Sequence, residues 1–132
     1  MIYVNLTAHT VNRFKNLDDF YFDEIVKSYL PKKSDYIATR QNADIWYPTG
    51  NIARCSTHEA KIPSPDDIPY IKITWGDIIN LPKPEKDTIY IVSNVVATAA
   101  AKLGRNDCVM PARLVRNHAG QIIGCLVFAK LG

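Results

Sequence analysis

The clearest structural signal in the chain is the stretch Thr88-Ile-Tyr-Ile-Val-Ser-Asn-Val-Val-Ala-Thr-Ala-Ala-Ala-Lys-Leu-Gly104. Its first five residues are apolar or favour extended backbone, which predicts a buried strand. Ser93 or Asn94 is the type of residue that caps a helix, and the alanine-rich run 95–103 predicts the helix itself. The closing glycine stands where helices commonly end. This stretch therefore predicts a central strand that leads directly into a helix.

The N-terminal part of the chain predicts a strand followed by an amphipathic helix. Residues 1–6 place alternate apolar side chains on one face of a strand. Asn16 is a candidate helix cap, because the two aspartates after it suit the positive end of a helix dipole. Pro31 would end the helix. The apolar face of this helix would consist of Phe22, Ile25, Val26, Tyr29 and Leu30, which recur at helical spacing.

The remaining segments predict short strands. Candidates are residues 43–47, 52–57 and 70–75, separated by turn-forming residues. A final hairpin would join residues 114–117 to 121–128, and its second strand is almost entirely apolar, which predicts a central position. We therefore expect one α+β domain, residues 1–132, with a small, mostly antiparallel β core, an N-terminal amphipathic helix and an alanine-rich helix after a central strand.

Composition excludes several classes of partner. The chain has 132 residues, of which 47% are hydrophobic, enough to fill one core. The uncharged stretch 88–101 is shorter than the roughly 20 residues that span a bilayer. The N-terminus lacks a basic-then-apolar leader, so we expect a cytoplasmic protein without a membrane partner. The net charge of +3 is too small for a surface that binds a DNA or RNA duplex, but it suits a small anion such as a nucleotide.

The sequence offers several residues that suit phosphate. The N–H groups of the helix after Ser93 and Asn94 would favour an anion, although the same residues cap helices with a purely structural role. Guanidinium groups also bind phosphate, and the candidates are Arg54, Arg105, Arg113 and Arg116; solvated surface charge is the alternative for each. In a regular strand Arg113 and Arg116 point to opposite faces, so at most one of them should face a given site.

Aromatic residues are candidates for stacking on a base. Tyr90 precedes the predicted cap by three residues and is the best placed. Trp46 and Trp75 are predicted to lie in the core instead.

Metal binding and redox chemistry have weak support. The three cysteines form no CxxC pair and are odd in number, which favours buried thiols in a reducing compartment. Cys55 and His58 form a candidate metal half-site, but no second pair has zinc-site spacing to complete it. Cys108, His118 and Cys125 are the residues that would have to do so. No catalytic motif is present either, so neither a metal nor another cofactor is expected.

Four blocks of the sequence resemble a family of small phage and prophage proteins. They are Val4-Asn-Leu-Thr-Ala-His-Thr10, residues 48–54, residues 87–93, and Arg105-Asn-Asp107 followed by residues 115–124. The blocks cover about half of the chain and keep the family's order. The chain is similar to the first type of Thoeris anti-defence protein, a phage sponge that sequesters cyclic ADP-ribose-type immune signals without cleaving them.

The resemblance implies a binding protein, not an enzyme, that assembles as a homo-oligomer, a dimer or a hexamer. It also implies pockets between subunits and, in some members, sites for the cyclic oligonucleotide signals of CBASS defence. Residues 13–47 are longer than the matching part of the family, an insertion that would cover or reshape a pocket. Ala8 replaces the proline of the family's opening. Carried over by motif, the ligand-binding residues would be Arg54, Tyr90, Ser93, Asn94, Arg105, Asp107 and Arg116, although Arg105 and Asp107 would equally suit an internal ion pair.

The predicted function is therefore a sponge for a cyclic nucleotide signal. The arginines would bind its phosphates, Tyr90 or an arginine would stack on its adenine, and Asn94 would donate directional hydrogen bonds. One alternative is a small nucleotide hydrolase or phosphodiesterase with a histidine as its base. Another is a phage accessory protein that contacts only other proteins.

Overall fold

The computed structural model describes residues 1–131, so Gly132, the last residue of the predicted single domain, lies outside it. The described part contains ten β-strands, one α-helix and one short 3-10 helix. In chain order these are β1 (Ile2–Asn5), β2 (Val11–Phe14), the 3-10 helix (Leu17–Asp19), β3 (Phe20–Asp23), β4 (Ser28–Pro31), β5 (Ala43–Trp46), β6 (Arg54–Ile62), β7 (Tyr70–Ile79), β8 (Thr88–Ile91), α1 (Asn94–Lys102), β9 (Cys108–Arg116) and β10 (Ile122–Ala129).

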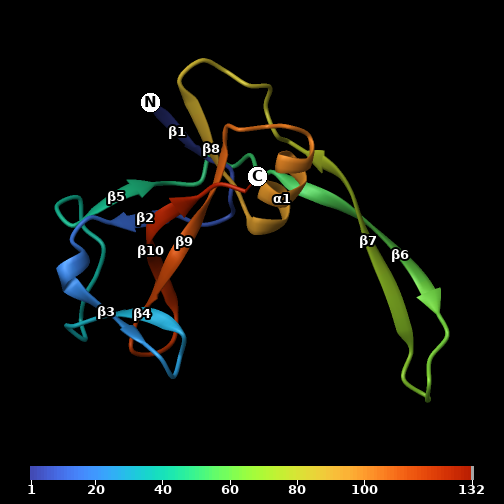
Figure 1. Ribbon diagram of the computed structural model, residues 1–132, viewed down its shortest axis with the longest axis horizontal. Helices are drawn as coiled ribbons and strands as arrows, with labels where there is room; N and C mark the ends of the chain where they lie inside the picture. The colour runs from blue at the N-terminus through green and yellow to red at the C-terminus, as the bar shows by residue number, and fades with distance from the viewer. Residues whose placement is uncertain (132) are drawn as a thin grey trace.

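Six of the strands curl into a nearly closed, barrel-like sheet, in the order β1-β8-β9-β10-β2-β5 (Figure 1). The two outermost strands of this order, β1 and β5, contact each other without pairing. The β3–β4 hairpin extends the sheet, because β4 lies beside β9. Strands β6 and β7 form a separate two-stranded sheet that projects away from the barrel (Figure 1). We call β6, β7 and the turn between them, residues 54–79, the arm.

The predicted α+β fold class is wrong. The chain is mostly β, and the α-helix that the structure describes in residues 1–131 is α1, which is not N-terminal. The segment predicted as an N-terminal amphipathic helix forms the β3–β4 hairpin. Asp23 explains the difference, because its carboxylate accepts hydrogen bonds from the backbone N–H groups of Ile25 and Val26 at 2.8 and 3.2 Å and so fixes a turn. Ile25, assigned to the apolar helix face, lies in this turn and is 92% exposed.

Aromatic pairing stabilises the same hairpin. The rings of Phe22 and Tyr29 pack edge to face across the strands, with their centroids 5.1 Å apart. The run of aromatic residues that begins at Phe20 favours extended backbone and is the feature of the sequence that indicates a strand here. Asn16 does act as a helix cap, but the helix that it caps is only the 3-10 turn Leu17–Asp19.

The prediction of a mostly antiparallel core is also wrong, because the barrel sheet is mixed. β1 runs parallel to β8, β8 parallel to β9, and β10 parallel to β2. Only the β9–β10 and β2–β5 pairs in the six-strand order are antiparallel. Parallel neighbours need long connections. α1 connects β8 to β9, whereas β1 and β8, and likewise β2 and β10, are joined by segments that contain several other strands, which the sequence does not mark as crossovers.

The predicted strand-to-helix stretch is confirmed. β8 leads into α1, and the Ser93 hydroxyl accepts a hydrogen bond from the Val96 N–H at 3.4 Å, as an N-cap does. Gly104 follows the helix with a φ of 78°, the left-handed conformation that favours glycine. The final hairpin is confirmed as well, and β10 lies in the interior of the sheet order. In residues 1–131, no helix is long and apolar enough to cross a membrane.

β8 is buried on both faces, which explains its almost continuous apolar sequence. Tyr90 and Val92 pack toward α1, together with Val96, Ala97 and Ala100 of the helix. The alternate side chain, Ile91, points into the barrel and contacts Val11 and Val109 there. A further cluster, centred on Phe14, fills the space between the barrel and the β3–β4 hairpin.

The side chain of Asn5 closes the gap between β1 and β5. Asn5 is 1% exposed, and its Nδ2 donates to the backbone carbonyl of Trp46, at the end of β5, at 2.9 Å. The same Nδ2 donates to the His9 carbonyl at 2.7 Å, and Oδ1 accepts from the N–H and the hydroxyl of Thr7. The rings of Tyr3 and Trp46, whose centroids lie 5.4 Å apart, also contact each other across the gap. One buried side-chain amide thus connects two strands that do not pair with each other.

We predict that Asn5→Ala lowers the free energy of unfolding by about 3 kcal/mol, because it leaves buried backbone groups without partners. Asn106→Ala is the matched control: Asn106 is exposed, and its loss should cost less than about 0.5 kcal/mol. Urea unfolding of both variants checks this. Equal, small effects would mean that the Asn5 bonds do not stabilise the barrel.

Candidate functional site

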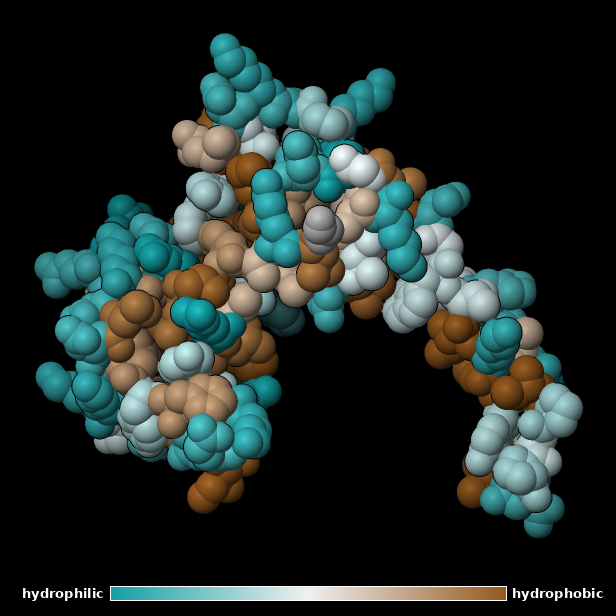
Figure 2. Space-filling model, in the orientation of Figure 1, coloured by the Kyte–Doolittle hydropathy of each residue, from teal (hydrophilic) through white to brown (hydrophobic). Residues whose placement is uncertain are grey.

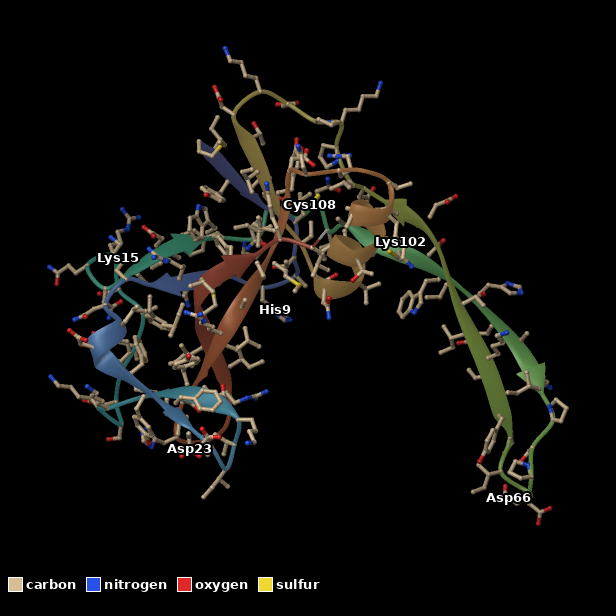
Figure 3. All side chains as sticks on the ribbon, viewed as in Figure 1. His9, Lys15, Asp23, Asp66, Lys102 and Cys108 are labelled. Carbon is tan, nitrogen blue, oxygen red and sulfur yellow. The ribbon has the colours of Figure 1, made fainter. Side chains whose placement is uncertain are left out.

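A cavity of about 820 Å³ opens beside the start of α1. Three of the sequence blocks that carry the resemblance meet around it. Thr7, His9 and Thr10 come from the first block, Ser93 from the third, and Asn117 from the fourth. Figure 3 shows His9 near the start of α1. Segments more than 80 residues apart in the chain therefore form one concave site.

The first wall of the cavity is a loop that Asn5 shapes. The hydroxyl of Thr7 donates to Oδ1 of Asn5 at 2.7 Å and lies 3.0 Å from the His9 carbonyl oxygen. Because Asn5 also binds the His9 carbonyl, the backbone from residue 5 to residue 9 is held in a tight turn. The turn presents His9 and Thr10, both exposed, to the cavity.

The second wall is the N-terminus of α1. Ser93 and Asn94 are both exposed and both line the cavity. The first N–H groups of a helix have no partner within the helix, so this end carries partial positive charge. No Lys, Arg, Asp or Glu is among the described residues that line the cavity, so no carboxylate there opposes an anion.

The third wall is the turn between β9 and β10. Oδ1 of Asn117 accepts from the N–H groups of Ala119 and Gln121 at 3.0 and 2.9 Å, which fixes the turn. Beyond it, Gly124 allows β10 to approach β2, because a Cβ at this position would lie 2.7 Å from the carbonyl oxygen of Asn12. A glycine is therefore needed where the two strands meet below the cavity.

The fourth wall comes from the insertion, residues 13–47. Tyr36, Ile37 and Ala38 line the cavity, so the insertion does shape it. The Tyr36 hydroxyl donates to Oδ2 of Asp19 at 2.8 Å. Burial, together with this hydrogen bond and the negative charge of Asp19, raises the pKa of Tyr36 to about 12. Tyr36 is therefore a neutral hydrogen-bonding group near pH 7.

The predicted arginines do not line this cavity. Arg116 lies in β9 next to Asn117, and its Nη1 donates to the carbonyl of Gly120 at 2.8 Å within its own turn. Arg54 is exposed at the start of the arm. Arg113 is exposed with a φ of 50°, so β9 is not regular there and the strand-parity argument that separated Arg113 from Arg116 does not hold.

The other predicted residues have structural partners. Tyr90 is 3% exposed, packs under α1 and donates from its hydroxyl to the Lys83 carbonyl at 3.3 Å, so neither face of its ring is open to a base. Burial raises the pKa of its hydroxyl. Arg105 and Asp107 form an internal ion pair through two hydrogen bonds of 2.9 Å, the alternative that the sequence left open. Of the seven predicted ligand residues, the structure brings only Ser93 and Asn94 to the cavity.

A second cavity, of about 650 Å³, lies between α1 and the start of the arm. Asn94 borders this cavity too, together with Lys102 and Trp75. Trp75 is 61% exposed, so the prediction that it belongs to the core is wrong. Trp46 does pack against the barrel interior, beside Phe128.

The cysteines are buried thiols, as the sequence predicts. Burial is the main cause that raises the pKa of Cys108 and of Cys125 to about 11, so both are protonated near neutral pH. Among residues 1–131, no three His, Cys, Asp or Glu side chains lie together as metal ligands would. The Cys55 and His58 half-site is therefore not completed by Cys108, His118 or Cys125.

Sequence reasoning missed most of the cavity lining. Thr10, Asn12 and Ile123 carry no chemical motif and meet only because β2 lies beside β10. The one signal in the sequence for these walls was the set of blocks that carry the resemblance, because three of the blocks contribute residues to the cavity.

We predict that Arg105→Ala lowers the free energy of unfolding at pH 7 by roughly 3 kcal/mol, because it leaves the largely buried Asp107 carboxylate without its cation. The hydrogen bonds from Arg105 hold the pKa of Asp107 below its usual value. Their stabilisation is present above the pKa of the unfolded carboxyl and is lost as the pH falls through the folded value.

The difference between wild type and Arg105→Ala should therefore shrink in acid, below about pH 4. Urea unfolding at a series of pH values measures it, with the exposed Lys130→Ala as control. A difference that stays constant down to pH 2 would contradict the assigned role of the ion pair.

No family model matches the chain, and no curated protein or solved structure does so either. A function for the cavity therefore depends on its own geometry and chemistry.

Proposed function

We propose that this chain binds a cyclic nucleotide signal in the 820 Å³ cavity and sequesters it without cleaving it. The observation that carries the proposal is the convergence of three separate sequence blocks on one cavity. Residues that only support the fold need not lie at one concave surface, whereas residues that bind the same ligand must do so. The proposed setting is the cytoplasm of a bacterial host, where a phage sponge would meet immune signals.

The size and lining of the cavity suit a nucleotide. A volume of about 820 Å³ lies within the range of small-molecule sites, which are mainly apolar with a few convergent polar groups. Met110, Pro111 and Ile123 supply apolar surface for a base. The N–H groups at the start of α1 would bind phosphate, and the Asn94 amide would donate or accept at the ribose or the base. Arg116 stands outside the lining and is not assigned to the ligand.

Binding without cleavage fits the available side chains better than hydrolysis. His9 is the one histidine among the described lining residues, and no carboxylate there can orient it as a base. Cys125 also lines the cavity, but burial raises the pKa of its thiol to about 11, which keeps the thiol protonated and weakly nucleophilic. The lining thus supplies hydrogen-bond donors and apolar contacts rather than a nucleophile with its base.

The direct test is to identify what the protein releases. Purified protein is mixed with cyclic ADP-ribose isomers or with cyclic dinucleotides, freed of unbound ligand by gel filtration, denatured by heat and analysed by mass spectrometry. We expect one of these compounds to be released intact. Release of a linear or hydrolysed product would indicate the hydrolase instead, and release of nothing would leave a protein that contacts only other proteins.

We further predict that Thr10→Asp weakens binding at least tenfold, because it places a carboxylate in the cavity opposite the ligand phosphates. Thr98→Asp is the control, since Thr98 is also exposed but lines only the smaller cavity. Calorimetry measures affinity, and thermal melts verify folding. A loss only at Thr98→Asp would move the ligand to the smaller cavity, and no loss at either position would remove it from both.

A further inference from the structure

The arm is the least covered part of the molecule. Nearly all of its residues are exposed, and the exposed set includes large apolar side chains (Figure 2). Figure 3 places Asp66 at the far tip of the arm, well away from Lys102 on α1. An isolated two-stranded hairpin is at best marginally stable in water, because each strand can bury side chains only against the other. An extended arm of this kind therefore needs a partner surface.

The accessible surface area of the chain also indicates that the arm has a partner. It amounts to 9045 Å². A compact monomer of 14.9 kDa is expected to expose about 7,000 Å². The difference, about 2,000 Å², exceeds the roughly 800 Å² that each partner buries in a stable interface of standard size. One arm therefore offers enough surface for a stable interface.

The register of the arm divides its side chains into two faces. Six consecutive cross-strand pairs, from Thr57–Trp75 to Ile62–Tyr70, are antiparallel and unbroken. Directly opposed residues share a face, and alternate residues lie on opposite faces. One face therefore carries an apolar row on β7, formed by Ile71, Ile73 and Trp75, which are 49%, 50% and 61% exposed.

The β6 row of the same face carries opposite charges two residues apart. Glu59 stands opposite Ile73, and Lys61 opposite Ile71. A two-fold axis level with the Ala60–Lys72 pair would place Glu59 against Lys61 of a second copy, and Lys61 against Glu59 of that copy. The same axis, which runs across the strands between the two faces, places Ile71 against Ile73 of the second copy and Ile73 against its Ile71. This face is self-complementary, as an interface between identical subunits must be.

We propose that the arm joins two copies of this chain face to face, through the apolar row of β7 and two symmetric Glu59–Lys61 ion pairs. The apolar row supplies most of the buried surface, and the ion pairs set the register. The proposal does not depend on what the 820 Å³ cavity binds, because the arm contributes no residue to the lining of that cavity.

The first test is the association of the full chain, measured by sedimentation equilibrium. We expect a dimer at micromolar concentration, weakened at least tenfold by Ile73→Asp and less than about twofold by Thr74→Asp. Thr74 is the matched control, because it is exposed at the next position, on the opposite face. Thermal melts of the whole chain establish that both variants fold. A monomer at 100 µM, or equal effects of the two variants, would overturn the proposal.

The second test uses charge reversal to examine the register. Glu59→Lys and Lys61→Glu should each weaken the dimer about tenfold, because each turns two attractions into two repulsions. The double variant restores both pairs and should associate like wild type. Mixing the two single variants should give mainly the mixed dimer, which native ion exchange separates by its intermediate charge. A random mixture of dimers, or a double variant weaker than either single one, would refute the face-to-face register.

Discussion

The hydrogen bonds of the buried Asn5 amide connect the closure of the barrel to the first wall of the cavity. Toward β5, Nδ2 binds the Trp46 carbonyl and closes a barrel whose outermost strands do not pair. Toward the cavity, the same side chain binds His9 and Thr7 and so shapes the first wall. A buried amide must find partners for both of its polar ends, and here those partners lie on separate elements. Barrel closure and cavity geometry are therefore coupled through one side chain.

The rest of the architecture follows from the mixed sheet. Parallel pairs bring the ends of β1 and β8 together, so the loop after β1 lies beside the start of α1. The pairing of β10 with β2 then adds the β9–β10 turn and the inserted segment as further walls. The barrel interior is filled by side chains such as Ile91, and the cavity lies between the start of α1 and the inserted loop at residues 36–38. The arm projects from this body, and most of its residues are exposed.

The sequence predicts local features of this fold well and long-range ones poorly. The Ser93 cap, α1 and the final hairpin were foreseen because their signals lie within a few residues of one another. The β3–β4 hairpin was misassigned, since Ile25 and Val26 match helical spacing while Asp23 fixes a turn that the spacing does not reveal. The sequence predicts Tyr90 as a stacking ring, but the helix that it precedes covers it. Ser93 and Asn94, predicted from the sequence as ligand residues, line the cavity, but its other walls depend on parallel pairing that no local pattern encodes.

The central claim is that residues 5–10, 92–94 and 117–124 form one binding site. Hydrogen–deuterium exchange of the intact chain, with and without a saturating cyclic ADP-ribose, tests this most directly, because a ligand in the cavity shields all three segments together. We predict slower exchange in these three segments and in residues 36–38, with no change that depends on the ligand at the tip of the arm, residues 63–69. Slower exchange confined to the arm and the C-terminal half of α1, or no change anywhere, would contradict the claim.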